Sequence, residues 1–248
     1  ENPVNKILIK EIFEQPEAIN KLIFNESENV AEICEKVRGK FDYILIAARG
    51  TSDNAARYAQ YLLGSFNEIQ VALATPSLYT TYQTPPSLKG ALVIGISQSG
   101  QSPDIVSVLT AAKEQRRPTI CITNDPSSPL ADEADHVIPL GCGIEKAIAA
   151  TKTYTSTLSA LSLLSCFLSE DRNTRLDDLK KIPEKISEVL KNSIENIEQT
   201  QRYRYMNHCV VIGRGFNYST AFEISLKIKE LTRVIATPYS SADFTHGP

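Results

Sequence analysis

Short apolar runs alternate with helical segments through residues 40–170, and this alternation constrains the fold more than any other feature. The runs, each rich in β-branched residues, lie at 42–48, 69–74, 91–96, 119–123 and 136–140. Strands connected by short helices pair in parallel, and the helices then cover both faces of the sheet. We therefore predict an α/β fold built on a doubly wound parallel sheet.

The same pattern starts again near the end of the chain. An apolar run at 208–212 leads into a glycine turn at 213–217, and a helical segment continues to about Arg233. This repetition predicts two copies of one α/β unit, the second of them incomplete. We expect a helical arm at 1–40, a first unit at 41–170, connecting helices at 171–205 and the start of a truncated second unit at 206–248.

The arm is predicted to be helical from residue 6 to residue 38, with a break before Pro16. Proline is tolerated in the first turn of a helix, so a second helix is expected to start there. The apolar residues beyond the break recur loosely at helical spacing. We expect this face to pack on the main domain or on a partner subunit.

Charge and cysteine content exclude several classes of protein. The net charge is −3 and the pI is about 5.7, which gives no electrostatic case for binding nucleic acid or an anionic membrane. The five cysteines are scattered and form no Cys-x-x-Cys pair, which favours reduced thiols over disulfides or structural zinc. No apolar run approaches the roughly 20 residues of a membrane span, and no signal segment is evident. We expect a cytoplasmic protein without a metal.

A hydroxyl-rich turn, Ser97-Gln98-Ser99-Gly100-Gln101-Ser102, follows the apolar run at 91–96. Pro103 comes next, so Ser102 is expected at the N-cap of a helix. Hydroxyls and backbone N–H groups at a helix N-terminus suit an anion, and a phosphate monoester fits neutral donors well. The alternative is an ordinary capped turn, since neither glycine-rich nucleotide fingerprint is present.

A second hydroxyl turn, Gly50-Thr51-Ser52, follows the run at 42–48, and a helix is expected from Asn54 to about Leu63. Both turns lie at the carboxyl ends of predicted strands, where ligands of parallel sheets bind. A third polar cluster at 145–152 leads into a long helix rich in Leu and Ser. Lys152 in this cluster is either a ligand or, as lysines at helix starts usually are, a solvated surface charge.

Three charged residues share one face of the helix that begins near Tyr218. Glu223, Lys227 and Glu230 are spaced i, i+4 and i+7. They form either a surface salt-bridge ladder or a catalytic group, in which Glu230 moves a proton on carbon and Lys227 supplies positive charge. His246 is the other candidate catalyst, because histidine is the side chain best suited to proton transfer under physiological conditions, although a histidine before Gly-Pro is commonly a loop residue.

These motifs resemble the sugar isomerase (SIS) family, and most closely its branch that handles amino-sugar phosphates. The motifs that carry the resemblance occur in the family's order along the chain: Gly50-Thr51-Ser52, Ser97-Gln98-Ser99-Gly100-x-Ser102, Ala149-Ala150-Thr151-Lys152, Leu226-Lys227-Ile228-Lys229-Glu230 and His246-Gly247-Pro248. The resemblance implies a SIS-type, flavodoxin-like layered fold. It also implies an enzyme that needs no cofactor.

The resemblance assigns roles to particular residues. It implies that Glu230 shuttles a proton between C1 and C2, that Lys227 lies at the carbonyl or amine end, and that His246 opens the sugar ring in the neighbouring subunit of a homodimer. The implied substrate-binding residues are Thr51, Ser52, Ser97, Gln98, Ser99, Ser102, Ile148 and Ala150. Ala150 stands where the aminotransferase branch usually has serine, so the resemblance does not carry over the sugar hydroxyl contact of that serine.

Four functions agree with these motifs. We expect a deaminase that converts glucosamine 6-phosphate to fructose 6-phosphate and ammonia through an enediol-type proton transfer. The alternatives are the synthase half of a glutamine:fructose-6-phosphate aminotransferase, a deglycase for sugar-phosphate adducts, and a non-catalytic sugar-phosphate sensor. A sensor would bind the sugar phosphate without releasing ammonia, whereas the substrates of a deaminase and a deglycase cannot be told apart from the residues.

Overall fold

A computed structural model describes residues 3–195 and 197–247 of the chain. Its main sheet has five parallel strands in the order β2-β1-β3-β4-β5. The strands are β1 (Tyr43–Ala47), β2 (Val71–Leu73), β3 (Ala91–Ile96), β4 (Thr119–Thr123) and β5 (His136–Pro139). The predicted doubly wound parallel sheet is therefore confirmed.

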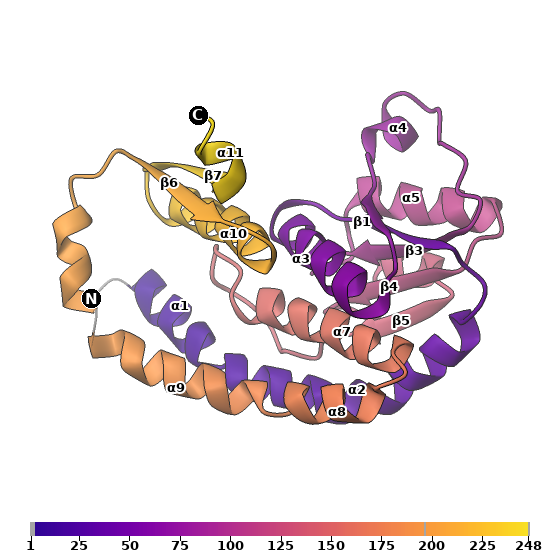
Figure 1. Cartoon of the computed structure of the whole chain (residues 1–248), viewed down its shortest axis with the longest axis horizontal. Coiled ribbons are helices and arrows are strands. Elements are labelled where there is room, and N and C mark those ends of the chain that lie inside the picture. Colours follow the sequence, from indigo (N-terminus) through magenta and orange to yellow (C-terminus); the bar gives the residue numbers. More distant parts are fainter. Residues whose placement is uncertain (1–2, 196, 248) are drawn as a thin grey trace.

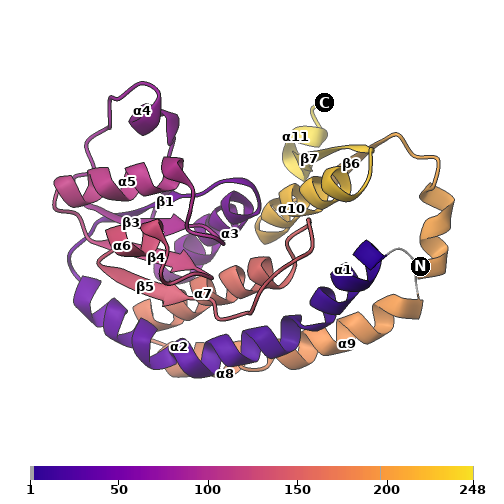
Figure 2. The ribbon, with the colours of Figure 1, turned by 180° about the vertical axis from the view of Figure 1, so that it is seen from behind.

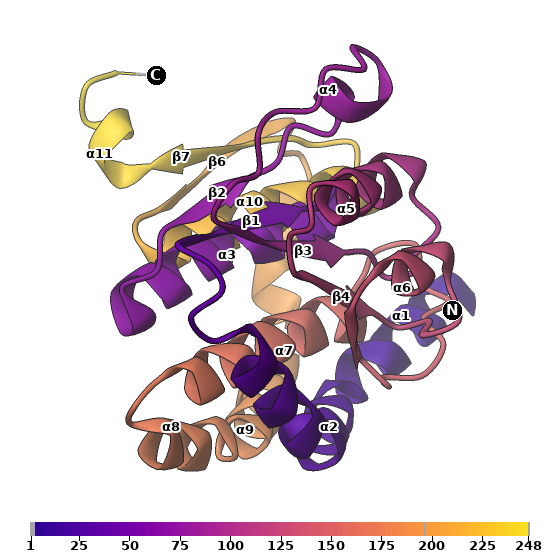
Figure 3. The same ribbon diagram turned by 90° about the vertical axis from the view of Figure 1, so that its right-hand side faces the viewer.

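Helices cover both faces of this sheet because successive strand residues point to opposite sides. Ile44 and Ile46 of β1 pack toward α2 (Gln15–Val37), α3 (Gly50–Asn67) and α7 (Lys152–Leu168). Leu45 and Ala47 pack toward α5 (Pro103–Glu114) and α6 (Pro129–Glu133). Figure 3 shows the sheet between these two helical layers.

The predicted break in the arm is confirmed, with α1 (Pro3–Phe13) ending just before α2. The arm lies along one side of the molecule, where α2 packs against α7 and α9 (Ile182–Glu195), as Figure 2 shows. The connecting segment consists of α8 (Arg172–Leu179), α9 and the 3-10 helix η1 (Ile197–Tyr203). None of the helices in residues 3–195 and 197–247 has the length and apolar character required to cross a membrane.

A second, two-stranded parallel sheet follows the connecting helices (Figure 1). It pairs β6 (His208–Gly213) with β7 (Ile235–Ser240), joined through α10 (Phe216–Leu231), and ends in α11 (Ser241–Phe244). This strand, helix, strand order repeats that of β1, α3 and β2. The helix α10 packs directly on α3, where the Phe216 ring lies 5.6 Å from that of Tyr58.

Two helices start earlier than predicted. The helix α3 begins at Gly50 instead of Asn54, because the N–H groups of Ser52 and Asp53 already donate to the Arg49 carbonyl. Thr51 and Ser52 therefore lie in the first helical turn instead of in a loop before it. The helix α10 likewise begins at Phe216 instead of Tyr218.

Candidate active site

The two hydroxyl turns lie side by side because of the strand order. The chain passes from β1 to β2 on one side and then to β3 on the other, so the sheet changes winding direction between β1 and β3. The crevice at such a switch point, outside the carboxyl ends of the strands, is where α/β sheets bind ligands. A cavity of about 120 Å³ opens there, lined by Arg49, Thr51, Ser52, Gln98, Ala150, Thr153, Tyr154 and Thr157.

The serine turn between β3 and α5 is partly folded on itself. The Ser97 hydroxyl accepts from the Gly100 N–H at 3.1 Å, and the Ser99 hydroxyl accepts from the Gln101 N–H at 3.3 Å. The Gln98 carbonyl accepts from the Asn124 N–H at 3.0 Å. These bonds fix the turn against β4 and its following loop.

Several donors of the same turn have no protein acceptor among the described residues. They include the hydroxyl of Ser102 and the backbone N–H groups of Gln98, Ser99 and Ser102. Ser102 occupies the predicted N-cap position of α5, but its side chain does not cap the helix. Unpaired donors at a helix N-terminus are the groups that an anion satisfies.

Gly100 permits this turn in two ways. Its φ of +63° is a left-handed conformation that other residues adopt only under strain, and a Cβ atom there would collide with the Ser128 side chain. Ser128 is fully buried at the start of α6. The turn can therefore approach α6 only because residue 100 has no side chain.

Arg49 adds a positive charge that the sequence analysis missed. Its guanidinium donates a 2.5 Å hydrogen bond to Asp104, and Thr80 donates to the same carboxylate at 3.0 Å. These hydrogen bonds hold the pKa of Asp104 below its ordinary value. Arg49 lies two residues after the end of β1, so its position at a strand's carboxyl end was the available signal.

Glu223 is the centre of a hydrogen-bond network that joins α10 to α3. It is only 5% exposed, and its carboxylate accepts from the Asn54 amide at 2.7 Å and from the Thr51 hydroxyl at 3.1 Å. Lys227 lies 3.3 Å from the same carboxylate. A buried charge is tolerated only when it is paired and hydrogen-bonded, and here three donors meet it.

Lys227 connects this network to Glu230. Its ammonium donates to the Thr51 hydroxyl at 3.0 Å and to the Glu230 carboxylate at 2.6 Å. The predicted salt-bridge ladder is therefore present, and it also reaches the hydroxyl turn after β1. This last contact distinguishes the group from a ladder on a solvated helix face.

Tyr154 of α7 lies between the two parts of the site, and the sequence analysis did not single it out. It lines the switch-point cavity and also a neighbouring cavity of about 230 Å³ that Glu223 and Lys227 share. Burial, and then the charge of Glu223, raise the pKa of Tyr154. Its phenol therefore remains protonated at neutral pH and is able to donate a hydrogen bond.

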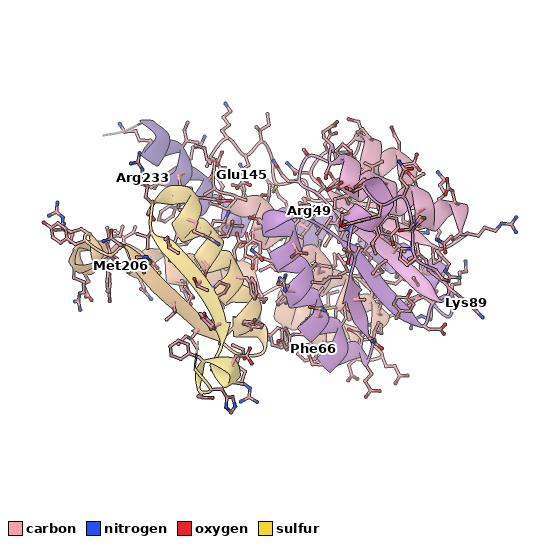
Figure 4. All side chains as sticks on the ribbon, turned by 90° about the horizontal axis from the view of Figure 1, so that it is seen from above. Arg49, Phe66, Lys89, Glu145, Met206 and Arg233 are labelled. Atoms are coloured by element: carbon pink, nitrogen blue, oxygen red, sulfur yellow. The ribbon has the colours of Figure 1, made fainter. Side chains whose placement is uncertain are left out.

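Comparisons with known proteins identify the family of this fold. The SIS domain model matches residues 40–166, which span the whole five-stranded sheet and most of α7. The chain belongs to the SIS domain family. In Figure 4, Arg49 and Glu145 of this SIS domain lie near the middle of the molecule, while Lys89 and Met206 lie toward opposite ends.

Curated relatives match nearly all of the chain. It is 32% identical over 254 residues to glutamine–fructose-6-phosphate aminotransferase [isomerizing] of Thermotoga maritima and 34% identical over 242 residues to that of Aquifex aeolicus. Each match covers 97% of this chain but 42% and 40% of the relative, respectively. The chain thus spans about two fifths of the length of these relatives.

Solved structures show the same architecture. The C-terminal domain of the Francisella tularensis glucosamine-fructose-6-phosphate aminotransferase superposes with a TM-score of 0.88 at 29% identity, covering 98% of this chain and 72% of that one. A Silicibacter pomeroyi protein, provisionally described as a phosphosugar isomerase, superposes with a TM-score of 0.91 at 31% identity. The match covers 98% of this chain and 73% of that one.

Of the remaining predicted site residues, one lies at the cavities and two lie on the surface. Ala150 lines both cavities, whereas Ile148 is 81% exposed. His246 is exposed just beyond α11, with its backbone N–H bonded to Asp243. Within the part of the chain that the structure describes, no three His, Cys, Asp or Glu side chains gather as a metal site would require.

Proposed function

We propose that this chain transfers a proton between C1 and C2 of a hexose 6-phosphate, in the reaction that links glucosamine 6-phosphate and water to fructose 6-phosphate and ammonia. The observation that carries the proposal is the position of Lys227. Its ammonium contacts Thr51 at the sheet's switch point and Glu230 on its own helix. A cation and a carboxylate thereby lie beside a ligand cavity, as aldose–ketose chemistry requires.

The phosphate of the substrate would bind at the serine turn. Ser97, Gln98, Ser99 and Ser102 offer hydroxyl, amide and N–H donors there, and the N-terminus of α5 favours negative charge. Thr51 and Ser52 line the adjoining cavity and would bind sugar hydroxyls. The absence of a charged side chain in the turn itself suits a ligand that must also leave.

The chemical step needs a base on carbon and positive charge at oxygen or nitrogen. Glu230 would take a proton from one carbon and return it to the other, while Lys227 stabilises the negative charge that develops on the adjacent oxygen. The contact with Glu223 would hold the Lys227 ammonium in place for this task. His246 would open the ring, acting in the site of a second subunit, so we also propose a homodimer.

Ammonia release and ammonia consumption are opposite directions of this one reaction. The turns at 48–54 and 97–104 resemble stand-alone deaminases, which favours release. The match of 97% of this chain to aminotransferases favours the synthase direction. The same residues would serve both directions, because each step is reversible at the same atoms.

The experiment uses the full-length polypeptide that contains this chain. Ammonia release from glucosamine 6-phosphate and amino-sugar formation from fructose 6-phosphate with ammonium are both measured, together with deuterium incorporation at the sugar carbons in heavy water. We expect turnover in at least one direction, and deuterium uptake that Glu230→Gln abolishes while sugar-phosphate affinity stays nearly unchanged. Sugar-phosphate binding without turnover or exchange would instead identify a sensor.

A further inference from the structure

The N-terminal arm contacts the candidate site through a buried carboxylate. Glu11 of α1 is only 4% exposed. Its two oxygens accept from the backbone N–H groups of Lys146 at 2.6 Å and Ala147 at 3.0 Å, residues in the loop before α7. Carboxylates that accept from backbone N–H groups form the stronger class of hydrogen bonds.

A second contact between the arm and this region lies one helical turn away. Glu14 accepts a 2.6 Å hydrogen bond from Lys152, whose side chain is 5% exposed. Lys152 is therefore a buried, paired charge, not the solvated surface lysine that its position at a helix start suggested. Burial lowers the pKa of Lys152, but the bond to Glu14 and the charges of Glu14 and Glu11 outweigh it and raise the pKa above its ordinary value.

The loop is also closed on itself. Glu145 accepts from the backbone N–H of Thr151 at 2.7 Å and from the Thr151 hydroxyl at 2.8 Å, and the Thr153 hydroxyl donates to it as well. A carboxylate at this helix N-terminus satisfies free N–H groups and complements the helix dipole. Residues 145–151 therefore have two anchors, one at α7 and one at Glu11.

The anchored loop forms a wall of the site. Ala149, Ala150 and Thr151 line the cavity that Tyr154, Glu223 and Lys227 share. Leu8, Ile12 and Gln15 from the arm line the same cavity. The arm thus supplies part of the wall itself and holds the rest of it through Glu11.

We propose that Glu11 is a positioning residue that holds the loop at 145–151 in the shape the substrate needs, so that the arm sets the affinity of the site. This inference rests on the proposed function. Glu11 touches no reacting atom, and its removal would loosen the wall without altering Glu230 or Lys227. The expected consequence is weaker sugar-phosphate binding with the chemical step largely preserved.

The test compares Glu11→Gln and Glu11→Ala with Glu17→Gln in the full-length polypeptide. Glu17 is an exposed carboxylate of the same arm, paired only with Lys21 in the described part of the chain. Amide hydrogen exchange at Lys146 and Ala147 reports the contact directly. We expect about ten-fold faster exchange in Glu11→Ala, and a smaller increase in Glu11→Gln, which keeps one acceptor oxygen.

Steady-state kinetics give the second readout. We expect KM for the sugar phosphate to rise about ten-fold in Glu11→Ala while kcat stays within about two-fold, and Glu17→Gln to match the wild type. Faster exchange with an unchanged KM would overturn the proposal, as would unchanged exchange. A wild-type protein that neither binds nor converts a hexose 6-phosphate would overturn the proposed function, whatever the exchange shows. Glu11→Gln keeps the size of the side chain and covers the case in which Glu11→Ala fails to fold.

Discussion

Asn54 donates a 2.7 Å hydrogen bond to the carboxylate of Glu223, a residue 169 positions later in the chain. The bond joins the first turns of α3, beside the main sheet, to α10 of the second sheet. Thr51 and Lys227 approach the same carboxylate. Glu223 is therefore a structural link and also the residue that fixes the Lys227 ammonium beside the switch point.

Removal of this carboxylate is expected to destabilise the protein. Glu223→Ala leaves the Asn54 amide and the Lys227 ammonium without their shared partner, at a cost of about 3 kcal/mol in the free energy of unfolding. Urea denaturation measures the loss. Glu184→Ala, at an exposed glutamate of α9, is the control and is expected to change stability by less than about 0.5 kcal/mol. A loss for Glu223→Ala no larger than the control would contradict the network.

Substitutions at two lysines of α10 provide a matched comparison of catalytic activity. Lys227 contacts Thr51 and two carboxylates, whereas Lys229 is exposed and makes no ion pair among the described residues. We expect Lys227→Met to lower kcat/KM by about 100-fold or more, because in the proposed function it removes the positive charge that stabilises the reacting oxygen. Lys229→Met is expected to keep near wild-type kinetics. Equal losses in both variants would argue against a catalytic role for Lys227.

The sequence was sufficient to locate the strands and the turns that follow them, because apolar periodicity and turn residues are local signals. It did not reveal that the turns after β1 and β3 are neighbours, which depends on strand order. The burial of Lys152 was missed for a similar reason, since its partner Glu14 lies 138 residues away. Arg49 likewise pairs with Asp104 across 55 residues. Such partners follow from the folded chain and leave no signal in local spacing.

The serine turn offers a test that separates backbone strain from steric collision. Gly100→Ala introduces a left-handed alanine whose Cβ collides with Ser128, and we expect about 3 kcal/mol of destabilisation together with loss of sugar-phosphate affinity. Gly141 has a similar φ of +58°, but a Cβ atom there would meet no neighbouring atom. Gly141→Ala is therefore expected to destabilise the protein by only about 1 kcal/mol. Chemical denaturation and calorimetric titration with the sugar phosphate give both values. Unaltered affinity in a folded Gly100→Ala protein would remove the turn from the binding site.

The ion pair between Glu14 and Lys152 predicts how stability depends on pH. The hydrogen bond and charge of Lys152 hold the pKa of Glu14 below its ordinary value of 4.5, and the pKa of Lys152 is raised above 10.5. A carboxylate with a lowered pKa contributes stability above its unfolded pKa and loses it as the pH falls through the folded value. Lys152, whose pKa is raised, contributes stability below its unfolded pKa. That stability is lost as the pH rises through the pKa of the folded state.

Glu14→Gln is therefore expected to cost about 2 kcal/mol at neutral pH, because the buried Lys152 then loses the carboxylate to which it is hydrogen-bonded. The difference from the wild type should be flat between about pH 5 and pH 10 and should shrink below 4.5 as Glu14 itself becomes neutral. Denaturation midpoints of both proteins, measured across this pH range, show how the stability difference depends on pH. Glu17→Gln, which removes an exposed pair with Lys21, is expected to change stability by less than about 0.5 kcal/mol at any pH. A Glu14→Gln difference that persists undiminished at pH 2 would show that the contact acts through packing and not through charge.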